Sequence, residues 1–228
     1  MTKKYSFLLF LIFCFTASAQ VIQKHWVETY VWQGYGAIST SRFQVFGKEW
    51  RIRYKTLSNG PLSVTLHELD NDKATIVVSR RAGRTLGFEQ YKLTPGEKFL
   101  FIQGSVGGWR VAIEQYVDSV EEWNYLRYVK QKPNLEKRAS WADENSREVS
   151  YVVDSPWKIE FEQISDGLLQ VQVLNATGSI LYDSMTGKAG NKGEGWIYAP
   201  GKYNIKVTTS DVAWRVHAFV ETEQAEEK

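Results

Sequence analysis

The residue types that usually carry catalysis are thinly spread along this chain. The three histidines, His25, His67 and His217, occur singly, whereas a zinc site needs three or four converging ligands. The one cysteine, Cys14, lies in an N-terminal segment that we expect to be removed, so the mature chain would have neither a thiol nucleophile nor a thiolate metal ligand. We therefore expect no enzymatic activity, no metal site and no cofactor.

Two aromatic residues could bind a ligand by stacking. Trp32 and Tyr35 stand beside Gly34 and Gly36, and we expect their side chains to be exposed. Four other tryptophans alternate with aliphatic residues and belong to a core face, namely Trp50, Trp109, Trp157 and Trp214. The first pair is therefore the better candidate for a sugar-binding surface.

Two basic, glycine-bearing segments, residues 80–84 and 187–193, fall at corresponding places of an internal repeat. Exposed amides and cations in such loops can hold an anion. The alternative is that both are solvated loops without a ligand. The candidate anion-binding residues are Arg80, Arg81, Arg84, Lys188 and Lys192.

The internal repeat covers most of the chain. The segment EWRIRYKTLSNGPLSVTL around Trp50 corresponds to PWKIEFEQISDGLLQVQV around Trp157, at a constant offset along the whole segment. Further on, TPGEKFLFIQGSVGGWRV corresponds to APGKYNIKVTTSDVAWRV, with Trp109 matching Trp214 at a slightly smaller offset. Because only loop lengths need to change, we interpret the chain as a duplicated domain.

Each repeat is built from short alternating strands. Trp50, Ile52 and Tyr54 share one face of the first clear strand, and this period of two places one side in a core and the other in water. The Asn59-Gly60 and Asp166-Gly167 pairs predict tight hairpins. We predict an all-β chain of two tandem β-sandwich, jelly-roll-like domains of duplicated origin, with one short connecting helix.

The connecting helix is predicted over residues 120–131. Ser119 and Glu122 have the spacing of a capping box, and Pro133 would end the helix. The predicted organisation is a signal peptide over 1–19, a first domain over 20–118, helix and linker over 119–138, a second domain over 139–221 and an acidic tail over 222–228.

Phe99 and Phe101 break the alternation that the second repeat obeys. They occupy outward positions at which the second repeat has Asn204 and Lys206. Large apolar side chains on an outward face usually mark a contact. We expect the cover to come from within the chain, from Trp123 and Leu126 of the predicted helix or from the other domain; the alternative is an external partner.

The motifs of the first repeat resemble those of known domains. They are Gly34, Gly36, Thr40 and Phe43, a Trp-Arg-Ile strand at 50–52 and a closing Trp-Arg-Val strand at 109–111. This set is similar to tandem small β-sandwich domains of exported bacterial proteins, mostly of unknown function, and more loosely to pre-peptidase C-terminal domains. The resemblance implies a fold and no activity. The second repeat lacks the Gly-x-Gly element, so a function of that loop would belong to the first.

The N-terminus predicts export. Lys3 and Lys4 precede an apolar run over residues 7–15, and Ala17 and Ala19 suit cleavage before Gln20. This run is about half the length of a membrane-spanning helix, so we expect no membrane insertion after cleavage and a periplasmic or secreted bacterial protein. Cleavage leaves 26 basic and 26 acidic residues, which gives no general attraction to nucleic acid.

Three functions remain open at this point. The first is a non-catalytic exported binding or structural module whose partner is a protein or glycan outside the cytoplasm. The second is a carbohydrate-binding protein that uses the exposed aromatics of the first domain. The third is a hydrolase using scattered acids such as Glu28, Glu89 or Asp183. Nothing in the sequence fixes the oligomeric state.

Overall fold

The structure is a computed structural model that describes residues 25–104, 107–119, 121–122, 126 and 133–222. The first eight strands are β1 (His25–Gly34), β2 (Ala37–Ser39), β3 (Glu49–Thr56), β4 (Leu62–Glu68), β5 (Lys73–Arg80), β6 (Leu86–Lys92), β7 (Lys98–Gly104) and β8 (Trp109–Val117). The second eight are β9 (Asn134–Asp143), β10 (Arg147–Val153), β11 (Trp157–Gln163), β12 (Leu169–Asn175), β13 (Ile180–Thr186), β14 (Lys192–Ile197), β15 (Gly201–Thr209) and β16 (Trp214–Thr222). The predicted all-β class is confirmed.

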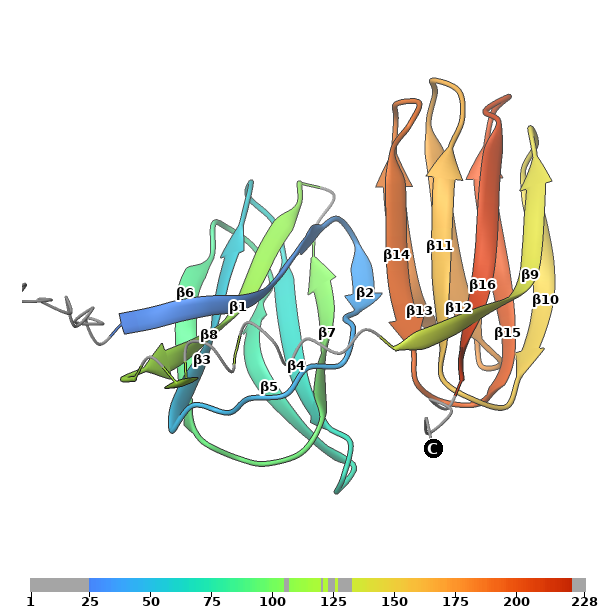
Figure 1. Cartoon of the computed structure of the whole chain (residues 1–228). Helices are drawn as coiled ribbons and strands as arrows, with labels where there is room; N and C mark the ends of the chain where they lie inside the picture. Colours follow the sequence, from blue (N-terminus) through green and yellow to red (C-terminus); the bar gives the residue numbers. More distant parts are fainter. Residues whose placement is uncertain (1–24, 105–106, 120, 123–125, 127–132, 223–228) are drawn as a thin grey trace, which may run out of the picture.

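The strands form three antiparallel sheets, and their order repeats. Two four-stranded sheets have the orders β1-β8-β3-β6 and β14-β11-β16-β9, and an eight-stranded sheet has the order β10-β15-β12-β13-β2-β7-β4-β5. Each strand of the first half has its counterpart eight strands later, at the same place in its sheet. We call β1–β8 the first unit and β9–β16 the second unit (Figure 1). In each unit two four-stranded layers face each other in the strand order of a jelly roll.

Alternation along the strands builds one core in each unit. In β3 the side chains of Trp50 and Ile52 are fully buried, and in β11 Trp157 and Ile159 occupy the matching positions, also fully buried. The sequence prediction that the four paired tryptophans belong to the core is therefore confirmed, since each is at most 1% exposed.

The Asn-Gly and Asp-Gly turns do not form hairpins, so that prediction was wrong. The turn at Asn59-Gly60 leads from β3 to β4, and these strands lie in different sheets; the same holds for Asp166-Gly167 between β11 and β12. Gly60 N–H donates instead to Gly83 O at 3.1 Å. The local residues favour a tight turn, but they do not determine which strands pair.

The segment between the units is described only in part. Glu121, Glu122 and Leu126 are helical, and the rest of the helix expected over 120–131, including Trp123, lies outside the described residues. Glu122 N–H donates to Ser119 Oγ at 3.1 Å, as a capping box requires. Strand β9 begins at Asn134, inside the predicted linker. Among the described residues no helix is long and apolar enough to cross a membrane.

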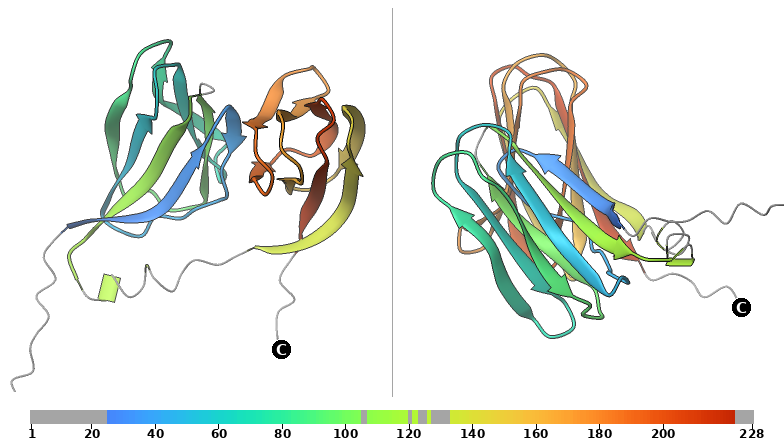
Figure 2. Two further views of the ribbon diagram at one scale, coloured as in Figure 1. Left: turned by 90° about the horizontal axis from the view of Figure 1, so that it is seen from above. Right: turned by 90° about the vertical axis from the view of Figure 1, so that its left-hand side faces the viewer.

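Strand β2 joins the units. It pairs with β7 of its own unit and, at Ala37 opposite Asp183, with β13 of the second unit, so that one sheet runs through both units (Figures 1 and 2). Ile38 contacts the cores of both units. Gly36 has a φ of +66°, and a Cβ there would lie 2.1 Å from the carbonyl oxygen of Asp183. The Gly-x-Gly element of the first repeat therefore allows the close approach of the second unit.

Polar contacts reinforce this junction. Tyr198 Oη of the second unit donates to Thr40 O at 2.6 Å. Arg42 lies over the Tyr198 ring and forms ion pairs with Glu97 of the first unit at 3.0 Å and with Glu221 of the second at 3.1 Å. The two units are thus connected by backbone pairing, core packing and ion pairs.

Candidate functional site

The outer face of the sheet β1-β8-β3-β6 brings charged side chains together from three separate strands. Strand β3 buries Trp50, Ile52 and Tyr54, so the residues between them point outward. Arg51 lies opposite Glu114 of β8, and Arg53 lies opposite Phe88 of β6. Side chains directly opposite on one face are close enough to interact.

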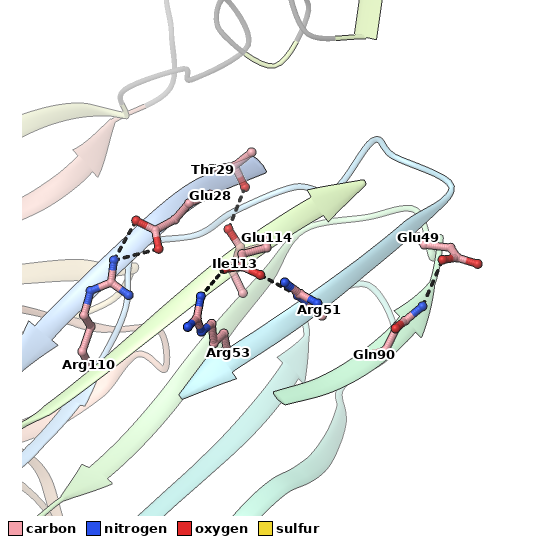
Figure 3. Close-up of polar contacts among 9 residues, drawn as sticks. All are labelled: Glu28, Thr29, Glu49, Arg51, Arg53, Gln90, Arg110, Ile113 and Glu114. Atoms are coloured by element: carbon pink, nitrogen blue, oxygen red, sulfur yellow. Dashed lines mark hydrogen bonds and ion pairs between the residues drawn. The ribbon is translucent and has the colours of Figure 1, made fainter. Parts of the chain in front are cut away.

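Glu114 fixes two of the arginines. Its carboxylate is 5% exposed and accepts from Arg51 Nε at 2.5 Å, while Arg53 Nη1 lies 3.3 Å from its second oxygen (Figure 3). The Arg51 guanidinium also lies 4.3 Å from the centre of the Trp26 ring and 5.0 Å from that of Phe88. Arg51 is therefore held by three neighbours, whereas the Arg53 side chain remains 53% exposed.

Beside these residues lies a small polar cleft of about 170 Å³. It is lined by Glu28, Arg53, Tyr54, Lys55, Leu86 and Arg110. Arg110 Nη2 donates to both carboxylate oxygens of Glu28 at 2.7 Å (Figure 3). Lys55 is exposed and forms no ion pair with any residue that the structure describes. Three cations thus line the cleft with Glu28; because Arg53 shares the Glu114 carboxylate with Arg51, the cleft keeps a net positive charge and is suited to an anionic group.

The matching face of the second unit has a different charge pattern. Arg53 and Lys55 correspond to Glu160 and Glu162 of β11, in the same alignment that matches Trp50 to Trp157. Lys158 Nζ pairs there with Glu160 at 2.7 Å, and Lys192 Nζ lies 3.2 Å from Glu162. The basic cleft is therefore a property of the first unit alone.

The predicted aromatic pair does not form one platform. Trp32 is half-buried, and its ring stacks on Tyr30 at 5.9 Å and contacts Phe43, so it packs against the first core. Tyr35 is 46% exposed and lies beside Gly108. Only Tyr35 of this pair therefore offers a largely free ring.

Phe99 and Phe101 point away from the first core, as the broken alternation predicts, and are half-buried. Tyr198 of the second unit covers Phe99, with 4.2 Å between the two ring centres, and His67 of β4 in the first unit stacks on Phe99 at 4.5 Å. Leu126 is buried elsewhere, beside Phe46 and Tyr116, so the prediction that it covers Phe99 was wrong, whereas the alternative of cover by the other domain is confirmed for Phe99. The physical reason is that the junction places the second unit, rather than the connecting segment, on this face of β7.

The predicted anion loops lie at equivalent places but in different units. Gly60 N–H donates to Gly83 O in the first unit, and Gly167 N–H donates to Gly187 O in the second. All five basic candidates are exposed, namely Arg80, Arg81, Arg84, Lys188 and Lys192. Lys192 is paired with Glu162. None of the five lines the basic cleft, although Arg80 acts electrostatically on Tyr54, which does line it.

In the described part of the chain no three or more His, Cys, Asp or Glu side chains lie close enough together to hold a metal ion.

The sequence did not predict the basic cleft. Its cations come from β3 and β8, and Glu28 comes from β1, so they are far apart along the chain. A comparison of outward positions between the repeats, Arg53 against Glu160 in particular, would have revealed the difference.

No protein-family model and no curated protein matches the chain. Among solved structures it is similar to the PBSX exported protein XepA, at 10% identity and a TM-score of 0.29 over 87% of this chain and 86% of that one. It is also similar to a conserved protein of unknown function from Pseudomonas aeruginosa PAO1, at 11% identity and a TM-score of 0.27 over 84% and 78%. A third is a cupin 2 conserved barrel domain protein from Leptotrichia buccalis, at 8% identity and a TM-score of 0.24 over 90% and 92%.

Proposed function

We propose that this protein is an exported, non-catalytic binding module of two β-sandwich domains that arose by duplication, and that its first domain binds an acidic glycan. The observation that carries the proposal is the basic cleft, where Arg53 and Lys55 are exposed beside the Arg110–Glu28 pair. Arginine and lysine side chains in this arrangement bind carboxylate or sulfate groups through charge-assisted hydrogen bonds.

The surroundings of the cleft favour a sugar polymer. Phe88 is 53% exposed and Leu86 is 74% exposed, and both lie next to the cations on β6. Apolar rings and chains beside cations suit a ligand that carries both charged groups and apolar sugar faces. The export signal predicted over residues 1–19 would take the protein to where such polymers occur.

The test is a calorimetric titration of the purified protein with polygalacturonate, using dextran as the neutral polymer. We expect binding of polygalacturonate that weakens as salt is added, because exposed charges are screened. The variant Arg53→Gln with Lys55→Gln should lose at least about tenfold in affinity, since two charged hydrogen-bonding groups are removed.

The matched control is Lys202→Gln with Lys206→Gln, which removes two exposed lysines from β15 of the second unit. It should bind polygalacturonate as the wild type does. A wild type that does not bind, or a cleft variant that binds equally well, would contradict the proposal. Binding of dextran that survives in the cleft variant would favour a neutral sugar held by exposed aromatics such as Tyr35.

A further inference from the structure

The junction between the units is a head-to-tail contact. The second unit uses its edge strand β13, and the first unit uses a different edge, β2. A contact between two unlike edges can repeat from one molecule to the next. The first unit still has a free edge like the one that the second unit uses in the junction, and the second unit still has a free edge like the one that the first unit uses. The unused edges are the two ends of the eight-stranded sheet, β5 in the first unit and β10 in the second.

Strand β5 is the counterpart of β13. Ile76 of β5 corresponds to Asp183 of β13. Ile76 lies opposite Thr65 of β4, Asp183 lies opposite Gln172 of β12, and Thr65 and Gln172 match in the repeat alignment. Ile76 is 70% exposed. Leu93 is 44% exposed, and it corresponds to Tyr198 in the alignment that matches Trp109 to Trp214. The first unit thus exposes apolar side chains at the two places where the second unit makes its junction.

Strand β10 is the counterpart of β2. Ile38 lies opposite Ile102 of β7, and Arg147 lies opposite Val207 of β15. Since Ile102 and Val207 match in the repeat alignment, Ile38 corresponds to Arg147. If β5 met β10 in the register of Asp183 with Ala37, Ile76 would lie opposite Ser146. In the same register Arg80 would lie opposite Asp143, once the bulge in β5 is counted.

The charges of the two free edges are complementary in this register. The end of β5 and the loop that follows it carry Arg80, Arg81 and Arg84, all exposed. Asp143 ends β9 and lies 3.7 Å from Arg147 of β10, and the exposed Glu144 follows it in the turn before β10. Opposite charges on facing strands favour pairing and help to fix its register.

We propose that a second copy of this chain docks here, with β5 of one molecule adding to β10 of the next, so that the eight-stranded sheet continues from molecule to molecule. The contact repeats the junction inside the chain. The β-bulge in β5 does not prevent it, because β13 also pairs with β2 beside a bulge in the β12–β13 ladder. The arginines of the 80–84 loop then serve as an assembly contact rather than as a site for a small anion.

The test is sedimentation velocity of the purified protein over a range of concentrations. The wild type should give a weight-average mass that rises with concentration beyond that of a dimer. Ile76→Lys should lose this rise, because a lysine on an edge strand opposes further pairing. Glu144→Arg should lose it as well, since the turn before β10 would then meet the arginines of residues 80–84 with like charge.

A mixture distinguishes this contact from a symmetric one. Each blocked variant keeps the edge that the other has lost, so equal amounts of the two should form a dimer and nothing larger. The matched control Leu168→Lys places the same charge at a 59% exposed apolar residue outside both edges and should assemble as the wild type does. A wild type that stays monomeric, an Ile76→Lys variant that assembles normally or a mixture without dimers would overturn the proposal.

Discussion

At one buried position in each unit, different residues donate a hydrogen bond to the same backbone carbonyl of the preceding turn. Lys98 of β7 is fully buried, and its Nζ donates to the carbonyl oxygens of Thr94 at 2.8 Å, Pro95 at 3.0 Å and Gly96 at 3.1 Å. Tyr203 of β15, at the matching position, donates its hydroxyl to Ala199 O, the counterpart of Thr94 O. The fold therefore requires a donor for the carbonyls of this turn, and an amine or a phenol satisfies that requirement.

The outward positions differ far more between the units. The first unit has Arg53 where the second has Glu160, and it has Phe99 where the second has Asn204. It thus carries both the basic cleft and the face that receives the other unit, whereas the second unit supplies the docking strand β13. The comparison indicates that the two cores share one packing scheme, whereas the residues on the outer faces differ and form different contacts in the two units.

The largest expected effect tests the equivalence of the cores. Trp50→Ala and Trp157→Ala should each lower the free energy of unfolding by about 3–5 kcal/mol, through lost burial and a cavity. Trp50 Nε1 donates to Lys92 O at 3.1 Å, whereas Trp157 Nε1 has no hydrogen-bond partner among the described residues. Trp50→Ala should therefore cost about 1 kcal/mol more. Denaturant unfolding measures both, and a smaller cost at Trp50 would contradict this reading.

The next effect concerns the junction. Gly36→Ala adds a Cβ that meets the Asp183 carbonyl, at a residue with a φ of +66°. Gly83→Ala is the matched control, because its φ is +88° but nothing lies within 4 Å of the added carbon. Both should lose roughly 1–2 kcal/mol from the left-handed backbone alone.

Gly36→Ala should lose more than Gly83→Ala, and it should also uncouple the thermal unfolding of the units, which calorimetry would record as two transitions. Equal losses without uncoupling would show that the units meet in some other way.

The smallest effect is the pH dependence that His67 contributes on the first unit's side of the junction. Burial lowers the pKa of His67, which stacks on Phe99, and Asp72 acts in the opposite direction. The second unit has Leu174 at the matching position. As the pH falls below 6.5 the unfolded chain takes up this proton more readily than the folded chain does, so stability decreases. His67→Leu should reduce the difference between melting temperatures at pH 8 and pH 5, and an unchanged difference would contradict the assignment.

Much of the fold could be predicted because its signals are local. The period of two placed Trp50 and Ile52 inward, and the constant offset between the repeats matched them to Trp157 and Ile159. The turn residues at Asn59-Gly60 gave no information about pairing, because a turn within a sheet and a turn between sheets use the same residues.

The candidate site and the junction could not be predicted in the same way. The cleft joins Glu28, Arg53 and Arg110, which become neighbours only once three strands are adjacent in the sheet. The junction brings Ala37 opposite Asp183, across most of the chain. Neither arrangement leaves a periodic pattern in the sequence, and the outward position of Phe99 showed only that something must cover it.

The short length of strand β2 limits unwanted strand pairing while the chain is being synthesised. The N-terminal half is synthesised first. The first unit can therefore be complete once Val117 has been synthesised, before the residues of β13 have been added. During that interval the outer edge of β2 is bare, and a bare edge invites pairing with other nascent chains. Because β2 is only three residues long, a stray strand can form few hydrogen bonds with it. The outer edge of β2 therefore adds little to the risk of aggregation before β13 is synthesised.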